Sequence, residues 1–91
     1  MMPKFPLGQV VSTPEALQAM SRAGQSPVVF LERHRCGDWG CVCPSDARLN
    51  DEALREGGRL LSSYRTLLNE VVWVITEFDR SITTLLLPDE Y

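Results

Sequence analysis

The 91-residue sequence lacks any apolar run close to the ~20 residues that a membrane-spanning helix needs. Its first residues, MMPKFPLGQ, also lack the apolar stretch of a secretory signal peptide. We therefore expect a soluble, cytoplasmic protein with no membrane partner. Cysteine is scarce and odd in number, at three residues, so we expect reduced thiols and no disulfide framework.

Charge of either sign is also modest. Nine Lys and Arg residues stand against twelve Asp and Glu residues, which gives a formal net charge of −3 and a pI near 5.0. Nucleic-acid-binding proteins usually present a basic face, whereas these nine cations are spread along the chain, so the composition argues against nucleic acid as a partner. The hydrophobic content of 44% suits the one modest core of a single domain, residues 1–91.

Three segments in the first two thirds of the chain have the start and stop signals of helices. Each has a proline at its first position, where a missing N–H costs nothing, and a glycine at its end. Thr13 caps the first helix, or else Ser12 does so in a capping box with Glu15. The predicted helices span about residues 14–23, 27–36 and 44–56, and Asn50 can cap a new turn inside the third.

The remaining segments have the pattern of strands. QVVST, residues 9–13, suits a short edge strand, and RLLSSYRT, VVWVITEF and ITTLLLP are three extended runs with tight connections. We predict an α+β fold: an N-terminal strand, two or three short helices, then a three-stranded antiparallel β-meander that the helices cover on one face. The other face, with Trp73, would be partly open, which allows a homodimer.

The stretch HRCGDWGCVC, residues 34–43, holds the only histidine and all three cysteines. His34, Cys36, Cys41 and Cys43 are ligands that tetrahedral zinc accepts, so a small zinc-binding module is our alternative function. Their spacing, H-x-C-x4-C-x-C, is not a strong zinc signature, and four local ligands would join no distant segments. The competing interpretation packs His34 at a helix end and treats the cysteines as small, partly buried hydrophobic residues. A redox dithiol, or a Cys36 nucleophile with His34 as its base, finds less support in the sequence.

Two other stretches are candidate partner-binding sites. The GDWG turn, residues 37–40, either presents its tryptophan as an anchor for a protein partner or places that ring at the edge of the core. The turn at 76–81 holds two carboxylates that either do acid–base work or shape the turn and pair with arginine. The candidate partner-binding residues are Asp38, Trp39, Thr76, Glu77, Asp79 and Arg80.

The residues GDWG at 37–40 and the motif TEFDRSITTLLLPDEY at 76–91 resemble a family of small bacterial proteins labelled plasmid-related protein. The similarity runs from FPLGQVVSTPEAL to the end of the sequence and includes Asn50, Ala53, Leu54, Gly58, Arg59, Leu61, Ser62 and Tyr64. Members are encoded on plasmids and integrative elements and have no established activity. The family typically has a polar Asp-Gly hairpin where this chain has Leu68–Asn69. It has no cysteine cluster around GDWG, which counts against a family-wide metal site.

Small size, the absence of a catalytic constellation and this resemblance together favour a non-enzymatic protein. We expect a protein-interaction or accessory factor of a mobile genetic element, which binds a host or element protein and can modulate defence. We expect no catalytic residue and no cofactor, with zinc at residues 34–43 as the alternative. This interpretation requires the GDWG turn or the turn at 76–81 to be exposed.

Overall fold

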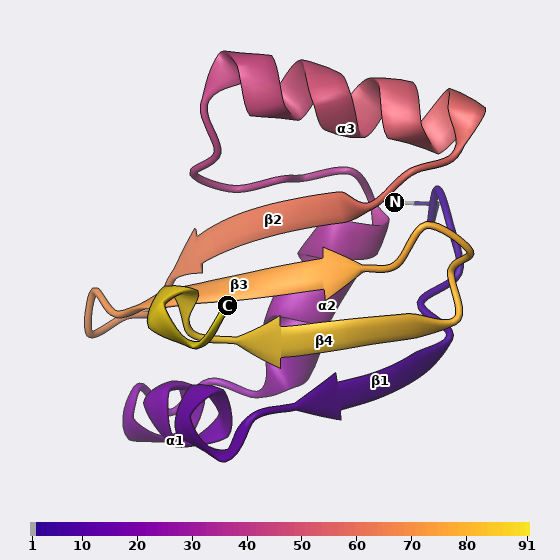
Figure 1. The fold of residues 1–91 in the computed structure, drawn as a ribbon. Coiled ribbons are helices and arrows are strands. Elements are labelled where there is room, and N and C mark those ends of the chain that lie inside the picture. The colour runs from indigo at the N-terminus through magenta and orange to yellow at the C-terminus, as the bar shows by residue number, and fades with distance from the viewer. Residues whose placement is uncertain (1) are drawn as a thin grey trace.

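The computed structural model describes residues 2–91, in which three α-helices and four strands precede a short 3₁₀ helix (Figure 1). In chain order the elements are β1 (Gln9–Ser12), α1 (Pro14–Arg22), α2 (Pro27–Arg35), α3 (Pro44–Glu56), β2 (Leu60–Arg65), β3 (Val71–Thr76), β4 (Ile82–Leu86) and η1 (Pro88–Glu90).

The four strands form one mixed sheet in the order β1–β4–β3–β2. β2, β3 and β4 pair antiparallel, whereas β1 lies parallel to β4 at one edge, with Val11 opposite Thr84. The α+β class is confirmed. β2, β3 and β4 form an antiparallel meander, but β1 joins it in parallel, so the sheet is four-stranded and mixed. The difference arises because the helices carry the chain from β1 to the far edge, and the following strands then return until β4 lies beside β1.

Local sequence explains where the first two helices start. Thr13, and not Ser12, caps α1, because its Oγ1 accepts a hydrogen bond from the Ala16 N–H at 3.1 Å. Ser26 caps α2, with its Oγ accepting from the Val28 N–H at 3.2 Å. Each cap contributes about 1 kcal/mol. All three helices begin at a proline as predicted.

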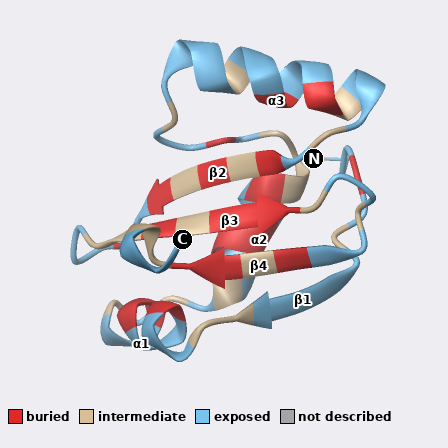
Figure 2. Ribbon diagram, viewed as in Figure 1, coloured by how far each residue is buried: buried red, intermediate tan, exposed pale blue. Residues whose placement is uncertain are grey.

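The core has two parts. The larger lies between the sheet and the helices α1 and α2, and α2 crosses behind the strands (Figures 1 and 2). The smaller lies where α3 runs alongside β2, so α3 flanks an edge of the sheet rather than covering its face. The larger cluster contains Ala16, Ala19, Met20, Phe30, Leu31, Tyr64, Val72, Val74 and Leu85, and the smaller contains Phe5, Trp39, Ala53 and Leu60.

The predicted strand boundaries are close to the observed ones, with one informative difference. β3 ends at Thr76 instead of Phe78, because Glu77 already belongs to the next turn: the Arg80 N–H donates to the Glu77 carbonyl at 2.9 Å. Arg80 adopts a positive φ of 62° in that turn. Asn69, in the β2–β3 connection, has a φ of 66°, a left-handed conformation that asparagine tolerates.

Candidate functional site

The GDWG turn seals one edge of the sheet. Around Gly40 the chain forms a parallel bridge to β2, in which the Ser63 N–H donates to the Trp39 carbonyl at 3.1 Å and the Cys41 N–H donates to the Ser63 carbonyl at 2.6 Å. A Cβ on Gly40 would lie 2.1 Å from the Ser63 carbonyl oxygen, and the φ of Gly40 is +74°. Only glycine satisfies both conditions, so this turn is part of the scaffold.

Asn50 seals the next part of the same edge. Its side-chain amide donates to the Leu61 carbonyl at 2.8 Å and its Oδ1 accepts from the Leu61 N–H at 3.1 Å. The side chain therefore satisfies both outward backbone groups of Leu61, as a neighbouring strand would do. The sequence suggested a helix-capping role for Asn50, but α3 continues through this position without a break.

Trp39 points into the smaller core and is only 6% exposed. Its ring lies 6.2 Å from that of Phe5 and 5.7 Å from that of His34, measured between centroids, and its Nε1 donates to Asp51 Oδ1 at 3.1 Å. The structure therefore overturns the expectation that Trp39 is an exposed anchor. Residues of the N-terminal segment and of α3 pack around the ring.

His34 is fully buried at the centre of a chain of polar groups. Its Nδ1 lies 2.5 Å from Ser62 Oγ and its Nε2 lies 2.9 Å from Thr76 Oγ1. Thr76 Oγ1 lies 2.7 Å from Thr83 Oγ1, which donates to the Leu7 carbonyl at 2.6 Å. Because the Leu7 carbonyl can only accept, Thr83 donates to it and accepts from the Thr76 hydroxyl. Thr76 in turn accepts from His34, so the neutral imidazole has its proton on Nε2. Nδ1 is then the acceptor for the Ser62 hydroxyl.

This network belongs to the core and offers no catalytic access. Burial, together with the positive charge of Arg80, lowers the pKa of His34 to about 4, so the ring is neutral at neutral pH. Ser62 and His34 have the contact of a nucleophile and its base, but both are fully buried. Thr76 is also 0% exposed, because its side chain lies on the face of β3 that α2 covers. The expectation that Thr76 contacts a partner is therefore wrong.

The four predicted zinc ligands are not assembled. His34 lies on the buried face of α2 with both ring nitrogens engaged, whereas Cys41 and Cys43 are exposed and Cys36 is half-buried at the end of that helix. Within residues 2–91 the three cysteines form no disulfide, and no group of three or more His, Cys, Asp or Glu side chains is placed to hold a metal ion.

A shallow depression of about 290 Å³ lies beside the GDWG turn, lined by Glu32, Arg33, Cys36 and Asp38. Arg33 contacts Asp38 at 2.7 Å and Arg35 contacts Glu32 at 3.0 Å. The hydrogen bond from Arg33 lowers the pKa of Asp38. Asp38 is exposed as predicted, but the charges around the depression neutralise one another in pairs, so it presents no strong field to a charged ligand.

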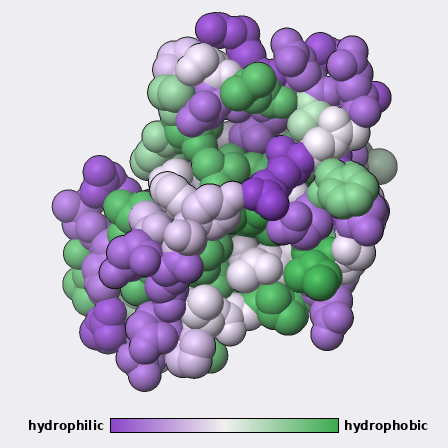
Figure 3. Space-filling model, viewed as in Figure 1, coloured by the Kyte–Doolittle hydropathy of each residue, from purple (hydrophilic) through white to green (hydrophobic). Residues whose placement is uncertain are grey.

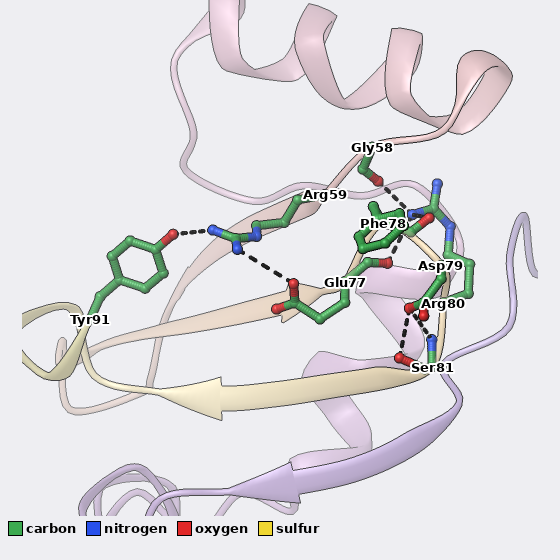
Figure 4. Close-up of polar contacts among 8 residues, drawn as sticks. All are labelled: Gly58, Arg59, Glu77, Phe78, Asp79, Arg80, Ser81 and Tyr91. Carbon is green, nitrogen blue, oxygen red and sulfur yellow. Dashed lines mark hydrogen bonds and ion pairs between the residues drawn. The ribbon is translucent and has the colours of Figure 1, made fainter.

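The turn between β3 and β4 is held rigidly (Figure 4). Asp79 accepts from the N–H and the hydroxyl of Ser81, at 3.1 and 2.6 Å, and these bonds lower the pKa of Asp79. The Arg80 guanidinium donates to the carbonyls of Ala53 at 2.9 Å, Gly58 at 2.5 Å and Glu77 at 3.1 Å. Arg80 thereby ties the turn to the C-terminal end of α3, where the negative end of the helix dipole favours a cation.

The two carboxylates of this turn do not cooperate. Glu77 points across the sheet toward Arg59, with Oε1 3.4 Å from the guanidinium, whereas Asp79 points toward Ser81 (Figure 4). Asp79 is exposed, and Glu77 and Arg80 are half-buried. Of the two alternatives for these carboxylates, the geometry matches the one in which Asp79 shapes the turn, and not a pair for acid–base work.

Phe78 is the prominent side chain of the turn, at 70% exposed. The predicted extended run VVWVITEF includes Phe78, so the sequence pattern did not identify Phe78 as a turn residue. The turn residues that follow, Asp79-Arg80-Ser81, were the signal that the strand ends earlier.

The face of the sheet opposite α2 carries no α-helix in the described chain, and the 3₁₀ helix η1 folds over one end of it (Figure 1). Tyr91 contacts Trp73 there, with ring centroids 5.7 Å apart, and Arg59 donates to the Tyr91 hydroxyl. Val11 and Ile82 are 40% and 38% exposed. Figure 3 looks onto this face and shows hydrophobic surface over the sheet, broken up by strongly hydrophilic side chains.

Comparisons with known proteins give no match: no family model, no curated protein and no solved structure is significantly similar to this chain. None of the described helices has both the length and the apolar character needed to cross a membrane.

Proposed function

We propose that this chain is a non-enzymatic protein-binding factor and that it holds its partner at the turn 77–81. The observation that carries the proposal is Phe78, a large aromatic ring that is 70% exposed on a turn fixed by hydrogen bonds. Aromatic anchors on rigid surfaces dominate many protein interfaces, because little conformational freedom is lost when they bind.

The surroundings of Phe78 indicate the chemistry of the partner. Asp79 lies next to it, exposed and with a lowered pKa, so a carboxylate borders the ring at neutral pH. Glu77 adds a second carboxylate, which forms an ion pair with Arg59. A partner with an apolar pocket and a basic rim would complement this surface.

The positions of the groups that could act in catalysis support a non-enzymatic role. The Ser62–His34 pair is buried, and the carboxylates of the turn point apart. The resemblance of GDWG and of the 76–91 motif to plasmid-related proteins adds the biological setting. We infer an accessory factor of a mobile genetic element, which acts by binding a host or element protein and thereby modulates defence.

Leu67 provides a matched control for the test. It is 79% exposed at the β2–β3 turn, and β3 separates the two turns along the chain. The partner is captured from cells that carry the gene, identified and purified, and its affinity is measured for wild type, Phe78→Ala and Leu67→Ala. A hot-spot residue contributes about 2 kcal/mol or more, so Phe78→Ala should weaken binding about 30-fold while Leu67→Ala leaves it unchanged. Equal affinities of the two variants would refute the assignment of the site.

A further inference from the structure

The two edges of the sheet differ in whether their backbone groups are hydrogen-bonded. At the β2 edge, Asn50 pairs the backbone of Leu61, and the GDWG turn pairs the backbone of Ser63. At the other edge, β1 has no neighbour within the described chain (Figure 1). An open edge is a template for another strand, and proteins usually protect it.

The backbone groups that β1 offers can be derived from its register. The Gln9 N–H donates to the Ser81 carbonyl at 2.9 Å and the Thr13 N–H donates to the Leu85 carbonyl at 3.0 Å. In a parallel ladder every second residue directs its backbone N–H and C=O groups toward the same neighbouring strand, so the backbone groups of Gln9, Val11 and Thr13 point toward β4. The N–H and C=O groups of Val10 and Ser12 therefore point outward.

The usual protections are missing from this edge. The strand reads QVVS, with no charge and no proline, and its pairing with β4 is continuous without a bulge. Val10 and Val11 are 42% and 40% exposed. Its short length of four residues does offer some protection.

We propose that two copies of this chain associate through β1, antiparallel, about a two-fold axis at Val11. Val10 of each copy then lies opposite Ser12 of the other, and the two pairs exchange four backbone hydrogen bonds. The sheet becomes continuous over eight strands. This dimer is independent of the proposed partner site, because the turn at 77–81 contributes no group to it.

A second copy fits this edge for two reasons. The outward groups lie symmetrically about Val11, so the strand is complementary to itself, and symmetric dimers are the commonest oligomers. The strand is also neutral, so two chains that each carry a net charge of −3 bring no like charges together at the axis. Gly8, with φ +64°, ends the extended backbone on one side, and α1 begins at Pro14 on the other. The register centred on Val11 is therefore the one that pairs the outward groups of Val10 with those of Ser12.

The contact is small. Four-residue strands bury less than the ~1,600 Å² of a standard interface, so the dimer should dissociate on dilution. Val11 on the open face would meet its symmetry mate, and Ile82, on the neighbouring strand of the same face, would extend this apolar contact.

Cysteine crosslinking tests both the contact and its register. In a background with Cys36, Cys41 and Cys43 replaced by serine, Val11→Cys places two thiols in a non-hydrogen-bonded antiparallel pair, with Cα atoms about 4.5 Å apart, which a disulfide can span. Val10→Cys is the matched control: it is equally exposed, but the two copies of residue 10 are offset along the strands beyond the ~7 Å limit of a disulfide.

Under mild oxidation we expect a disulfide-linked dimer for Val11→Cys in at least tenfold excess over Val10→Cys, and a mass that rises with concentration in sedimentation of the wild-type chain. Val11→Lys, which places two charges at the axis, should remain monomeric at the same concentrations while keeping its circular dichroism. Equal crosslinking of the two cysteine variants would overturn the proposal, as would crosslinking of Val10→Cys alone or a wild-type chain that stays monomeric at millimolar concentration.

Discussion

Acidification should destabilise this protein through its one histidine. His34 is 0% exposed and its pKa is lowered to about 4, against an ordinary value of 6.5 in the unfolded chain. Between these two values the unfolded state binds the proton and the folded state does not. The free energy of unfolding therefore falls as the pH drops from 6.5 to 4, and it is insensitive to His34 above that window.

The size of the effect follows from the difference between the two pKa values. At 1.36 kcal/mol per pKa unit, the change from 6.5 to about 4 corresponds to about 3 kcal/mol. A chain of this length has a total stability of roughly 5–14 kcal/mol, so the loss is a large fraction of it. Its physical origin is a charge placed among Ser62, Thr76 and the Arg80 guanidinium, without water to solvate it.

The assay is urea denaturation at a series of pH values from 7 to 4, for wild type and for His34→Gln. Glutamine keeps a donor and an acceptor but does not titrate, and the sequence has no other histidine. Asp38, Glu70 and Asp79 have lowered pKa values, so their contributions begin to be lost only near their ordinary values of 3.8 to 4.5, and this loss is common to both proteins. The wild type should lose about 3 kcal/mol more than the variant across the window. Parallel pH profiles would show that His34 has the same pKa in the folded and unfolded states.

Three substitutions test the scaffold around the GDWG turn. Trp39→Ala should lower the free energy of unfolding in denaturant by about 3–5 kcal/mol, because a buried ring leaves a cavity, and a loss below about 1 kcal/mol would contradict its place in the core. Asn50→Ala should cost about 1–3 kcal/mol and speed hydrogen exchange at the Leu61 amide, whereas unchanged exchange would show that the edge is sealed otherwise. Gly40→Ala should lower the melting temperature much more than Gly24→Ala: both have positive φ, but only at Gly40 does the new Cβ meet a carbonyl, and equal losses would contradict the close approach.

Features governed by local sequence were predictable. Thr13 and Ser26 cap their helices and Pro14 and Pro27 start them, because a cap needs only the side chain and the N–H two or three residues on. The left-handed Asn69 was predictable for the same reason.

Features that depend on contacts between distant segments could not be predicted from the sequence. The side chain of Trp39 could point either way until Phe5 and α3 were in place. The polar partners of His34 come from Ser62 and Thr76, which are remote in sequence, so a histidine beside three cysteines suggested a metal site instead. The parallel pairing of β1 with β4 likewise joins the two ends of the chain, and no local pattern encodes it.

We propose the turn at 77–81 as the partner-binding surface, and site-specific photo-crosslinking is the most direct test of this assignment. A photoreactive phenylalanine analogue is placed at position 78, or at the similarly exposed position 67 as a control, and the chain is irradiated in cells that carry the gene. We predict one discrete protein adduct from position 78 that is absent from position 67. No adduct at position 78, or the same adducts from both positions, would contradict the claim.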